Sequence, residues 1–233
     1  MLIIGEGALF TRAVQFCLDC GFPVDGLVSR VPLPERLLNS WGIPFLRTPD
    51  VNQDATFLQA HCQDGLVWSI NNPTILKSSL LTLPGFRYLN IHNGLVQTCR
   101  GLPEVSIFFS ILQEAPIYGV TLHQIDQGID TGPVLAQRFT TLSGEDTFES
   151  IMTRTLDLCG TILEEECPRV LGGACQPMEI DKRESRNYNY RMLPEAEPYR
   201  ASPAWFRAVA LGKYRVFFPR LMSWISTFPD QAR

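Results

Sequence analysis

Short apolar strands alternate with helical segments through the first 90 residues, and this alternation restricts the fold more than any other feature. The strand-like runs are Leu2–Ile4, Val24–Val28, Leu66–Ile70 and Tyr88–Ile91. Segments with helical periodicity lie between them and end near Gly21, His61 and Leu81. Buried strands joined by helical crossovers form parallel sheets that are covered by helices on both faces. We therefore predict an α/β fold with a mostly parallel, doubly wound sheet.

The boundaries of several helices can be predicted from local signals. Pro73 suits the first turn of a helix that runs to about Leu81. Residues 146–149 have the form of a capping box and open an amphipathic helix to about Leu171, which Pro168 kinks or ends. A buried helix is expected over Pro103–Leu112, and further strands over Val120–Gln124 and Val134–Phe139.

Bulk composition narrows the class of protein. The chain has 24 acidic and 20 basic residues and a formal charge of −4, so it has no overall positive field that would gather nucleic acid. No segment approaches the ~20 apolar residues of a membrane span, and the N-terminus lacks a secretory pattern. Seven scattered cysteines are typical of reduced thiols, which predicts a cytoplasmic protein without a zinc site.

A glycine pair after the first strand raises the alternative of a nicotinamide site. Gly5-x-Gly7 is half of a dinucleotide fingerprint, but Phe10 occupies the third glycine position. Ser29-Arg30 ends the second strand where a ribose-binding acid is expected. We therefore interpret the pair as a tight strand-to-helix turn and keep a nicotinamide-dependent oxidoreductase as a minor alternative.

Polar residues with the spacing that chemistry needs gather in residues 88–133. Asn90 and His92 project from the same face of one short strand, because side chains alternate along a strand. Asp130 follows in a glycine-rich turn that can hold a carboxylate beside an imidazole. Each residue taken alone could be structural. Together they would supply an amide, an imidazole and a carboxylate.

The order of these motifs resembles the folate-dependent formyltransferases, a family that includes glycinamide ribonucleotide and methionyl-tRNA formyltransferases. The resemblance rests on Asn90-x-His92, on Arg100-Gly101, on Gly119-Val120-Thr121-x-His123-x-x-Asp126, and on Asp130-x-Gly132-Pro133. It is specific over about residues 65–140 and implies a Rossmann-like, three-layer formyltransferase fold. It also implies that Asn90, His92 and Asp130 are catalytic, whereas His123 is interpreted as a structural or supporting residue.

Formyl transfer to an amine needs an oxyanion to be stabilised and a proton to be removed. The Asn90 amide can donate to the oxyanion, a contact worth ~3–4 kcal/mol in comparable sites. His92 can donate to the same oxygen or relay the proton, and Asp130 can orient the imidazole or accept the proton. The sequence leaves open which of them is the base.

The resemblance also implies where the donor, 10-formyltetrahydrofolate, binds. Its pterin is expected between two segments, of which the first follows the strand before Asn90 and the second precedes Asp130. The cofactor-binding residues predicted in this way are Val67, Trp68, Ser69, Ile70, Asn71, Gln124, Ile125, Asp126, Gln127, Gly128 and Ile129.

The acceptor is predicted to be a primary amine on a small or carrier-bound molecule. Glu104 could hold its ammonium and Arg100 a phosphate or carboxylate, although an exposed ion pair or a helix-dipole contact would explain both residues equally well. His92-Asn93-Gly94-Leu95 departs from the common form of the family and is closer to enzymes that formylate amino sugars or precursors of secondary metabolites. An amino sugar nucleotide, an ornithine-like precursor and a carrier-bound aminoacyl group all remain open.

The chain is predicted to divide into a catalytic domain, residues 1–175, and a C-terminal extension, residues 176–233. Too few residues follow position 175 for the barrel domain of the tRNA enzymes, so a nucleic-acid partner is not expected. The aromatic extension is interpreted first as a cover for the core, with a homodimer face or a carrier-protein dock as alternatives. Hydrolysis of the formyl donor is the alternative enzymatic activity.

Overall fold

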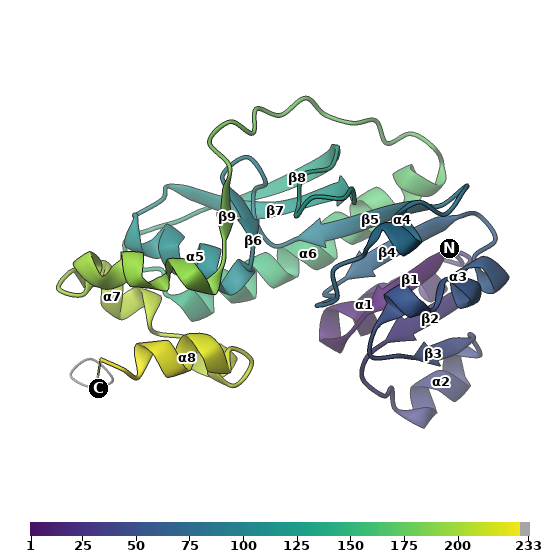
Figure 1. The fold of residues 1–233 in the computed structure, drawn as a ribbon, viewed down its shortest axis with the longest axis horizontal. Coiled ribbons are helices and arrows are strands. Elements are labelled where there is room, and N and C mark those ends of the chain that lie inside the picture. The colour runs from purple at the N-terminus through teal and green to yellow at the C-terminus, as the bar shows by residue number, and fades with distance from the viewer. Residues whose placement is uncertain (229–233) are drawn as a thin grey trace. The chain divides into compact units, whose positions relative to one another are not determined.

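The computed structural model describes residues 1–228, and an α/β architecture confirms the predicted fold class (Figure 1). The strands are β1 Leu2–Gly5, β2 Gly26–Ser29, β3 Phe45–Arg47, β4 Leu66–Ile70, β5 Arg87–His92, β6 Cys99–Gly101, β7 Ile117–Gln124, β8 Val134–Thr141 and β9 Arg186–Tyr188. The α-helices are α1 Gly7–Asp19, α2 Glu35–Trp41, α3 Ala55–His61, α4 Ser78–Leu81, α5 Pro103–Leu112, α6 Phe148–Leu171, α7 Pro203–Ala208 and α8 Pro219–Ile225. Short 3-10 helices are η1 Val51–Gln53, η2 Tyr190–Tyr199 and η3 Gly212–Val216.

The described chain forms two compact units, each built from separate stretches of sequence. Unit 1 contains Met1–Ile91, Leu122–Ala136 and Gly160–Met178. Unit 2 contains His92–Thr121, Gln137–Cys159 and Glu179–Arg233, of which residues 229–233 lie outside the described part. The predicted domain boundary at residue 175 stays a prediction.

Seven strands form the main sheet in the order β3-β2-β1-β4-β5-β7-β8. The pairs β1–β2, β2–β3, β1–β4 and β4–β5 are all parallel. The order reverses at β1, whose neighbours are β2 on one side and β4 on the other. Carboxyl ends of parallel strands at such a reversal commonly form a ligand crevice.

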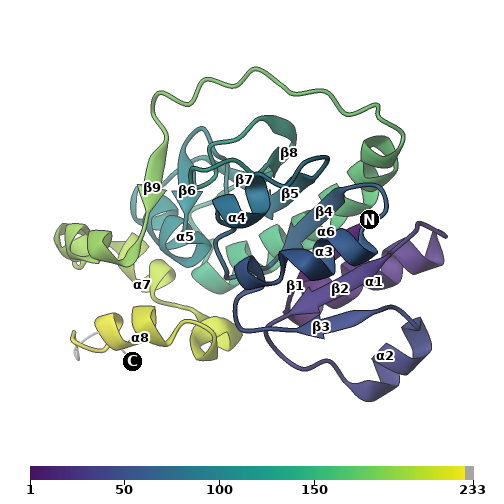
Figure 2. The same ribbon diagram turned by 45° about the vertical axis from the view of Figure 1, so that its right-hand side comes forward.

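Helices cover both faces of the sheet in unit 1. One face packs Leu2, Ile4 and Val67 against Leu58 of α3 and Leu80 of α4. The other face lies toward α1 and the second half of α6. An ion pair connects these two helices, with Arg12 Nε 2.8 Å from Glu164 Oε1. Figures 1 and 2 show α3 and α4 on the near side of these strands. The alternation of buried side chains along each strand therefore separates two apolar layers.

The predicted helix from Pro73 to Leu81 is wrong in its first half, since α4 begins at Ser78. Asn72 bonds back to the backbone of Thr74 through both of its amide atoms, at 3.0 and 3.1 Å, and so forms a local turn. Asn52 Oδ1 then accepts a hydrogen bond from the backbone of Lys77 at 2.7 Å. These side-chain bonds replace the first helical turn.

Unit 2 has a separate aromatic core. Phe108 of α5 packs edge-to-face against Trp205 of α7 and Trp224 of α8, with ring centroids 5.9 and 6.0 Å apart. Trp205 is fully buried, so part of the aromatic extension covers the core of this unit. Phe206 and Phe217 remain exposed.

The predicted capping box over residues 146–149 is wrong, because a reciprocal pair of hydrogen bonds forms one residue later, between Thr147 and Ser150. Thr147 Oγ1 accepts from the Ser150 amide at 3.2 Å, and Ser150 Oγ accepts from the Thr147 amide at 3.1 Å. Asp146 lies just before the box and bonds to Arg154 at 2.8 Å. The helix continues to Leu171, three residues beyond Pro168.

We expect Asp146→Ala to lower the free energy of unfolding by about 1–3 kcal/mol, because Asp146 also accepts from Ser143 and Ser150. Its hydrogen bond with Arg154 lowers the pKa of Asp146 from 3.8 to about 2. A lowered pKa stabilises the fold above pH ~4, and that contribution disappears as the pH falls toward about 2. Urea denaturation across this range measures both effects.

Glu145→Ala is the matched control, because Glu145 is the exposed acidic neighbour of Asp146. Equal losses of stability in the two variants, or a loss in Asp146→Ala that does not shrink in acid, would contradict the assignment.

Candidate functional site

Two predicted catalytic residues, Asn90 and Asp130, meet in unit 1 around a third residue, His123. Nε2 of His123 lies 3.1 Å from Asn90 Nδ2 and 3.4 Å from Asp130 Oδ1. The imidazole is 2% exposed, and the Asp130 side chain is 13% exposed. The site therefore has a buried ring between an amide and a carboxylate that solvent can still reach.

The backbone fixes the tautomer of His123. Its Nδ1 lies 2.7 Å from the carbonyl oxygen of Gln124, which can only accept, so Nδ1 must carry hydrogen. In the neutral ring Nε2 then accepts from Asn90, whereas in the protonated ring it can donate to Asp130. The imidazole can therefore exchange a proton while its orientation is maintained.

Strand pairing and a strained turn hold the other two residues in place. Asn90 lies near the end of β5 and is paired in register with Ser69 of β4. Asp130 has φ of +52°, a left-handed conformation that Asp tolerates better than most residues. Asp126 stabilises this turn by accepting from the Gly128 amide at 3.0 Å and from Thr131 Oγ1 at 2.5 Å. The turn thus presents Asp130 at a defined position.

His92, the third predicted catalytic residue, belongs to unit 2 and is 4% exposed. It follows Asn90 by two residues on β5. Its Nε2 lies 2.9 Å from the carbonyl oxygen of Cys99 in β6 and must therefore carry hydrogen. In the neutral ring Nδ1 is then the acceptor nitrogen. Its catalytic role stays a prediction.

The predicted donor-binding segments both lie beside Asn90. In the first segment Val67, Trp68, Ser69 and Ile70 are buried in β4, whereas Asn71 is exposed and bonds to the Glu6 carbonyl at 2.9 Å. In the second segment Gln124 ends β7, and the Ile125 amide donates to the Tyr88 carbonyl at 2.8 Å. Asp126, Gln127, Gly128 and Ile129 are exposed. The indole N–H of Trp68 is buried without a hydrogen-bond partner.

The predicted acceptor-binding residues lie in unit 2. Arg100 belongs to β6, and its Nε donates to Ser185 Oγ at 2.8 Å. Glu104 lies in the first turn of α5, is 7% exposed and accepts from the hydroxyl of Tyr190 at 2.6 Å. Both residues therefore contact the C-terminal segment that follows residue 178.

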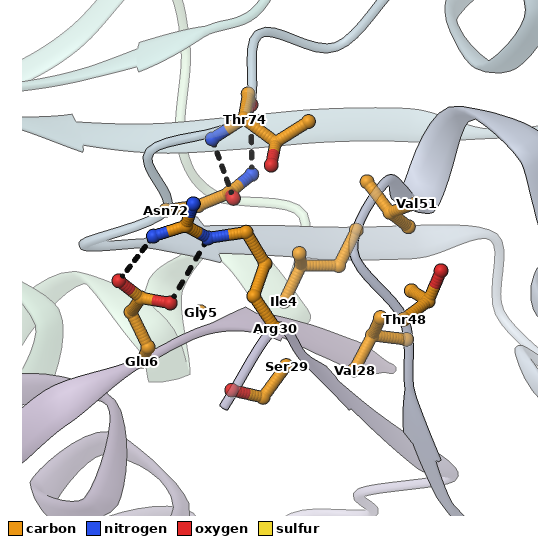
Figure 3. Close-up of a pocket in the computed structure, with 10 residues that line it drawn as sticks. All are labelled: Ile4, Gly5, Glu6, Val28, Ser29, Arg30, Thr48, Val51, Asn72 and Thr74. Carbon is orange, nitrogen blue, oxygen red and sulfur yellow. Dashed lines mark hydrogen bonds and ion pairs between the residues drawn. The ribbon is translucent and has the colours of Figure 1, made fainter. Parts of the chain in front are cut away.

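A separate small, open pocket lies at the carboxyl ends of β1 and β2 (Figure 3). Arg30 forms two hydrogen bonds to the Glu6 carboxylate there, at 3.2 and 2.8 Å. The other lining residues are Ile4, Gly5, Val28, Ser29, Thr48, Val51, Asn72 and Thr74. A dinucleotide ribose would bind at this place, where Glu6 already neutralises Arg30.

One group of possible metal ligands occurs among residues 1–228, namely Asp25, Cys62 and Asp64. The α-ammonium of Met1 lies between the carboxylates, 2.7 Å from Asp25 and 3.2 Å from Asp64. This group lies at the amino ends of the strands, whereas Asn90 lies at a carboxyl end. No helix in the described part of the chain is long and apolar enough to cross a membrane.

Sequence comparison finds a family model described as "Formyl transferase", which matches residues 67–166. A methionyl-tRNA formyltransferase of Anaeromyxobacter dehalogenans is 32% identical over 159 residues, which cover 67% of this chain and 50% of that protein. The chain thus spans about half the length of this curated relative.

Solved structures share the fold. A sugar N-formyltransferase from Shewanella sp. superposes with a TM-score of 0.73 at 19% identity, over 92% of this chain and 89% of that one. An N-formyltransferase from Helicobacter canadensis, determined with folinic acid and dTDP-3-aminofucose, gives 0.69 at 17% identity, over 89% and 79%.

We expect Gly94→Ala to disrupt the packing around the His92 ring, because a Cβ at residue 94 would lie 2.3 Å from Nε2 of that ring. The variant should lose about 1–3 kcal/mol of stability, and the imidazole ¹⁵N resonances of His92 should shift as the bond to Cys99 breaks. Thermal denaturation and NMR measure these changes.

Gly144→Ala is the control, since a Cβ at residue 144 meets no atom within 4 Å. Unchanged His92 resonances in Gly94→Ala would show that the loop adapts and that glycine is not required there.

Proposed function

The chain belongs to the formyltransferase family through the domain that residues 67–166 match, and from this premise we propose that it is an N-formyltransferase. The donor is 10-formyltetrahydrofolate, and the acceptor is a primary amine on a small or carrier-bound molecule. The observation that carries the proposal is His123, whose Nε2 lies within 3.4 Å of both Asn90 and Asp130.

These side chains supply the groups that the reaction needs. The donor contributes an activated formyl group, whose carbon forms a bond to the acceptor nitrogen while its bond to the folate nitrogen breaks. The Asn90 amide donates to the developing oxyanion. The ammonium of the acceptor gives one proton to Asp130 before it attacks, and this proton later passes to water. The second proton passes from the attacking nitrogen through His123 to the folate nitrogen. Atoms and charge therefore balance without a metal.

His92, the last residue of β5, is the third residue for which we propose a catalytic role. Its Nε2 hydrogen is directed to the Cys99 carbonyl, which fixes the orientation of the ring. The two imidazoles have opposite tautomers, since Nδ1 carries the hydrogen in His123 of unit 1 and Nε2 carries it in His92 of unit 2. We assign proton transfer to His123 and Asp130, and the catalytic role of His92 stays a prediction.

The residues near Asn90 fit a flat heteroaromatic donor. Gln127, Gly128 and Ile129 form an exposed loop that combines the polar side chain of Gln127 with the apolar side chain of Ile129, which is 42% exposed. Pterin recognition requires such a combination of hydrogen-bonding edges and apolar contact. The Helicobacter protein with this fold binds folinic acid, which supports a reduced folate as the donor.

The acceptor class is inferred from chemistry and from the neighbours. The chain carries a net charge of −4, which disfavours a tRNA acceptor. Structural neighbours include sugar N-formyltransferases, which supports an amino sugar nucleotide. An ornithine-like precursor or a carrier-bound aminoacyl group would present the same ammonium. A homodimer through residues 176–233 and a cytoplasmic location remain parts of the proposal.

The test supplies 10-formyltetrahydrofolate with one of three amines: dTDP-3-aminofucose, L-ornithine or L-valyl-pantetheine. Mass spectrometry of the amine and assay of free formate separate transfer from hydrolysis. An N-formyl product supports the proposal. Formate released at the same rate with and without amine would support a hydrolase instead. Saturable binding of NADH or NADPH without folate binding would overturn the formyltransferase assignment.

Asn90→Ala is expected to lower kcat by about 10²–10³-fold with little change in the donor KM, because an oxyanion contact acts mainly in the transition state. Asn39→Ala, at an exposed position of α2, is the matched control. Steady-state kinetics measure both. A kcat within threefold of the wild type would exclude Asn90 from the reaction.

His123→Phe should also lower kcat, and its effect should not add to that of Asn90→Ala. The physical reason is that one amide-to-imidazole bond, 3.1 Å long, couples the two residues. A double-mutant cycle in kcat measures the coupling. Fully multiplicative effects would show that the two residues act independently.

A further inference from the structure

Glu104 is a buried carboxylate that lacks a cationic partner. It is 7% exposed at the start of α5, and its one side-chain hydrogen bond comes from Tyr190. Within residues 1–228 no Lys, Arg or His forms an ion pair with it. A carboxylate taken out of water is costly unless a cation or several donors compensate. The Glu104 carboxylate can therefore accept further hydrogen bonds from a positively charged ligand.

The hydroxyl of Tyr190 donates a hydrogen bond to this carboxylate. Burial, and then the hydrogen bond to Glu104, raise the pKa of the Tyr190 phenol well above its ordinary value. The phenol therefore keeps its hydrogen at neutral pH. Arg220 of α8 lies over the Tyr190 ring, 4.5 Å from its centroid, and restricts the ring.

A short strand pair fixes Tyr190 relative to α5. Residues 185–190, here called the strap, place β9 beside β6 in parallel register, with Arg100 opposite Asn187 (Figures 1 and 2). The Leu102 amide donates to the Tyr188 carbonyl at 2.9 Å. Gly101 has φ of +91°, and a Cβ there would lie 2.3 Å from that same carbonyl oxygen. The strap can approach so closely because residue 101 is glycine.

Strand β6 connects the strap to His92 and to Arg100. His92 bonds to the Cys99 carbonyl at the start of β6, five residues before Glu104. Ser185, at the beginning of the strap, accepts from Arg100 Nε at 2.8 Å and donates to the Val96 carbonyl. His92 is thus bonded to β6, Arg100 belongs to it, and Glu104 follows β6 in the first turn of α5.

We propose that Glu104 binds the ammonium of the amine acceptor and that Tyr190 is the residue that positions Glu104 for it. The strap therefore determines specificity for a primary amine. An ammonium group offers three hydrogens and a full charge, which compensate the buried carboxylate. Tyr190 occupies one carboxylate oxygen and leaves the other to the ligand. This inference rests on the proposed formyl transfer.

The test is Tyr190→Phe, which removes the hydroxyl and keeps the ring under Arg220. We expect the acceptor KM to rise about tenfold, because a hydrogen bond to a charged group is lost. The donor KM should stay within twofold and kcat within threefold. Initial rates are measured with whichever of dTDP-3-aminofucose, L-ornithine and L-valyl-pantetheine the wild type formylates.

Two further variants separate positioning from a general structural effect. Glu104→Gln should raise the acceptor KM more than Tyr190→Phe does, and adding Tyr190→Phe to it should cause little further change. Tyr199→Phe removes the hydroxyl of another partly buried tyrosine on η2 and should leave every constant unchanged. Melting temperatures confirm that all variants fold.

The outcomes distinguish this inference from the proposed function. Failure of the wild type to formylate all three amines overturns both. Formylation with an acceptor KM unaltered in Tyr190→Phe, or with effects of Tyr190→Phe that persist in Glu104→Gln, overturns the role of Tyr190 alone. An unaltered KM in Glu104→Gln overturns the ammonium site while transfer itself stands.

Discussion

The parallel register of the central strands is the constraint on which the arrangement of polar groups in unit 1 depends. β4 and β5 pair so that Ser69 lies opposite Asn90, and both side chains reach the same face near the carboxyl ends. A slip of one residue would turn Asn90 away from His123 and place an apolar neighbour there. The apolar residues that pack against α3 and α4 therefore also fix the position of the Asn90 amide.

Loop geometry contributes the second half of the site. The turn that carries Asp130 combines a left-handed backbone at that residue with a side-chain clamp from Asp126. Left-handed conformations outside glycine cost energy and persist where surrounding contacts enforce them. Here the contacts hold the Asp130 carboxylate at 3.4 Å from Nε2 of His123.

Periodicity was sufficient to predict the fold class, α1, α5 and most of α6. In these helices the spacing of apolar residues in the sequence agrees with the side chains that are buried in the structure. The role of His123 could not be predicted in this way. As one histidine in an apolar strand it has the pattern of a core residue, and its contact with Asn90 depends on which strands become neighbours in the sheet. The missing first half of the helix after Pro73 has a similar cause, since Asn52, more than 20 residues away, takes the Lys77 amide. Long-range partners of polar side chains leave no local signal.

The strap compensates part of the electrostatic cost of burying the Glu104 carboxylate in unit 2. A first-turn acid is favoured by the helix dipole alone when it is exposed, but that gain of about 0.3–1 kcal/mol is smaller than the cost of burying an unpaired carboxylate. Tyr190 compensates part of the cost with one short hydrogen bond. The folded protein tolerates the remaining cost of burying this carboxylate, because the pairing of β6 with β9 does not depend on it. A carboxylate held in this way is preorganised for a cation, since binding then requires little rearrangement of the protein.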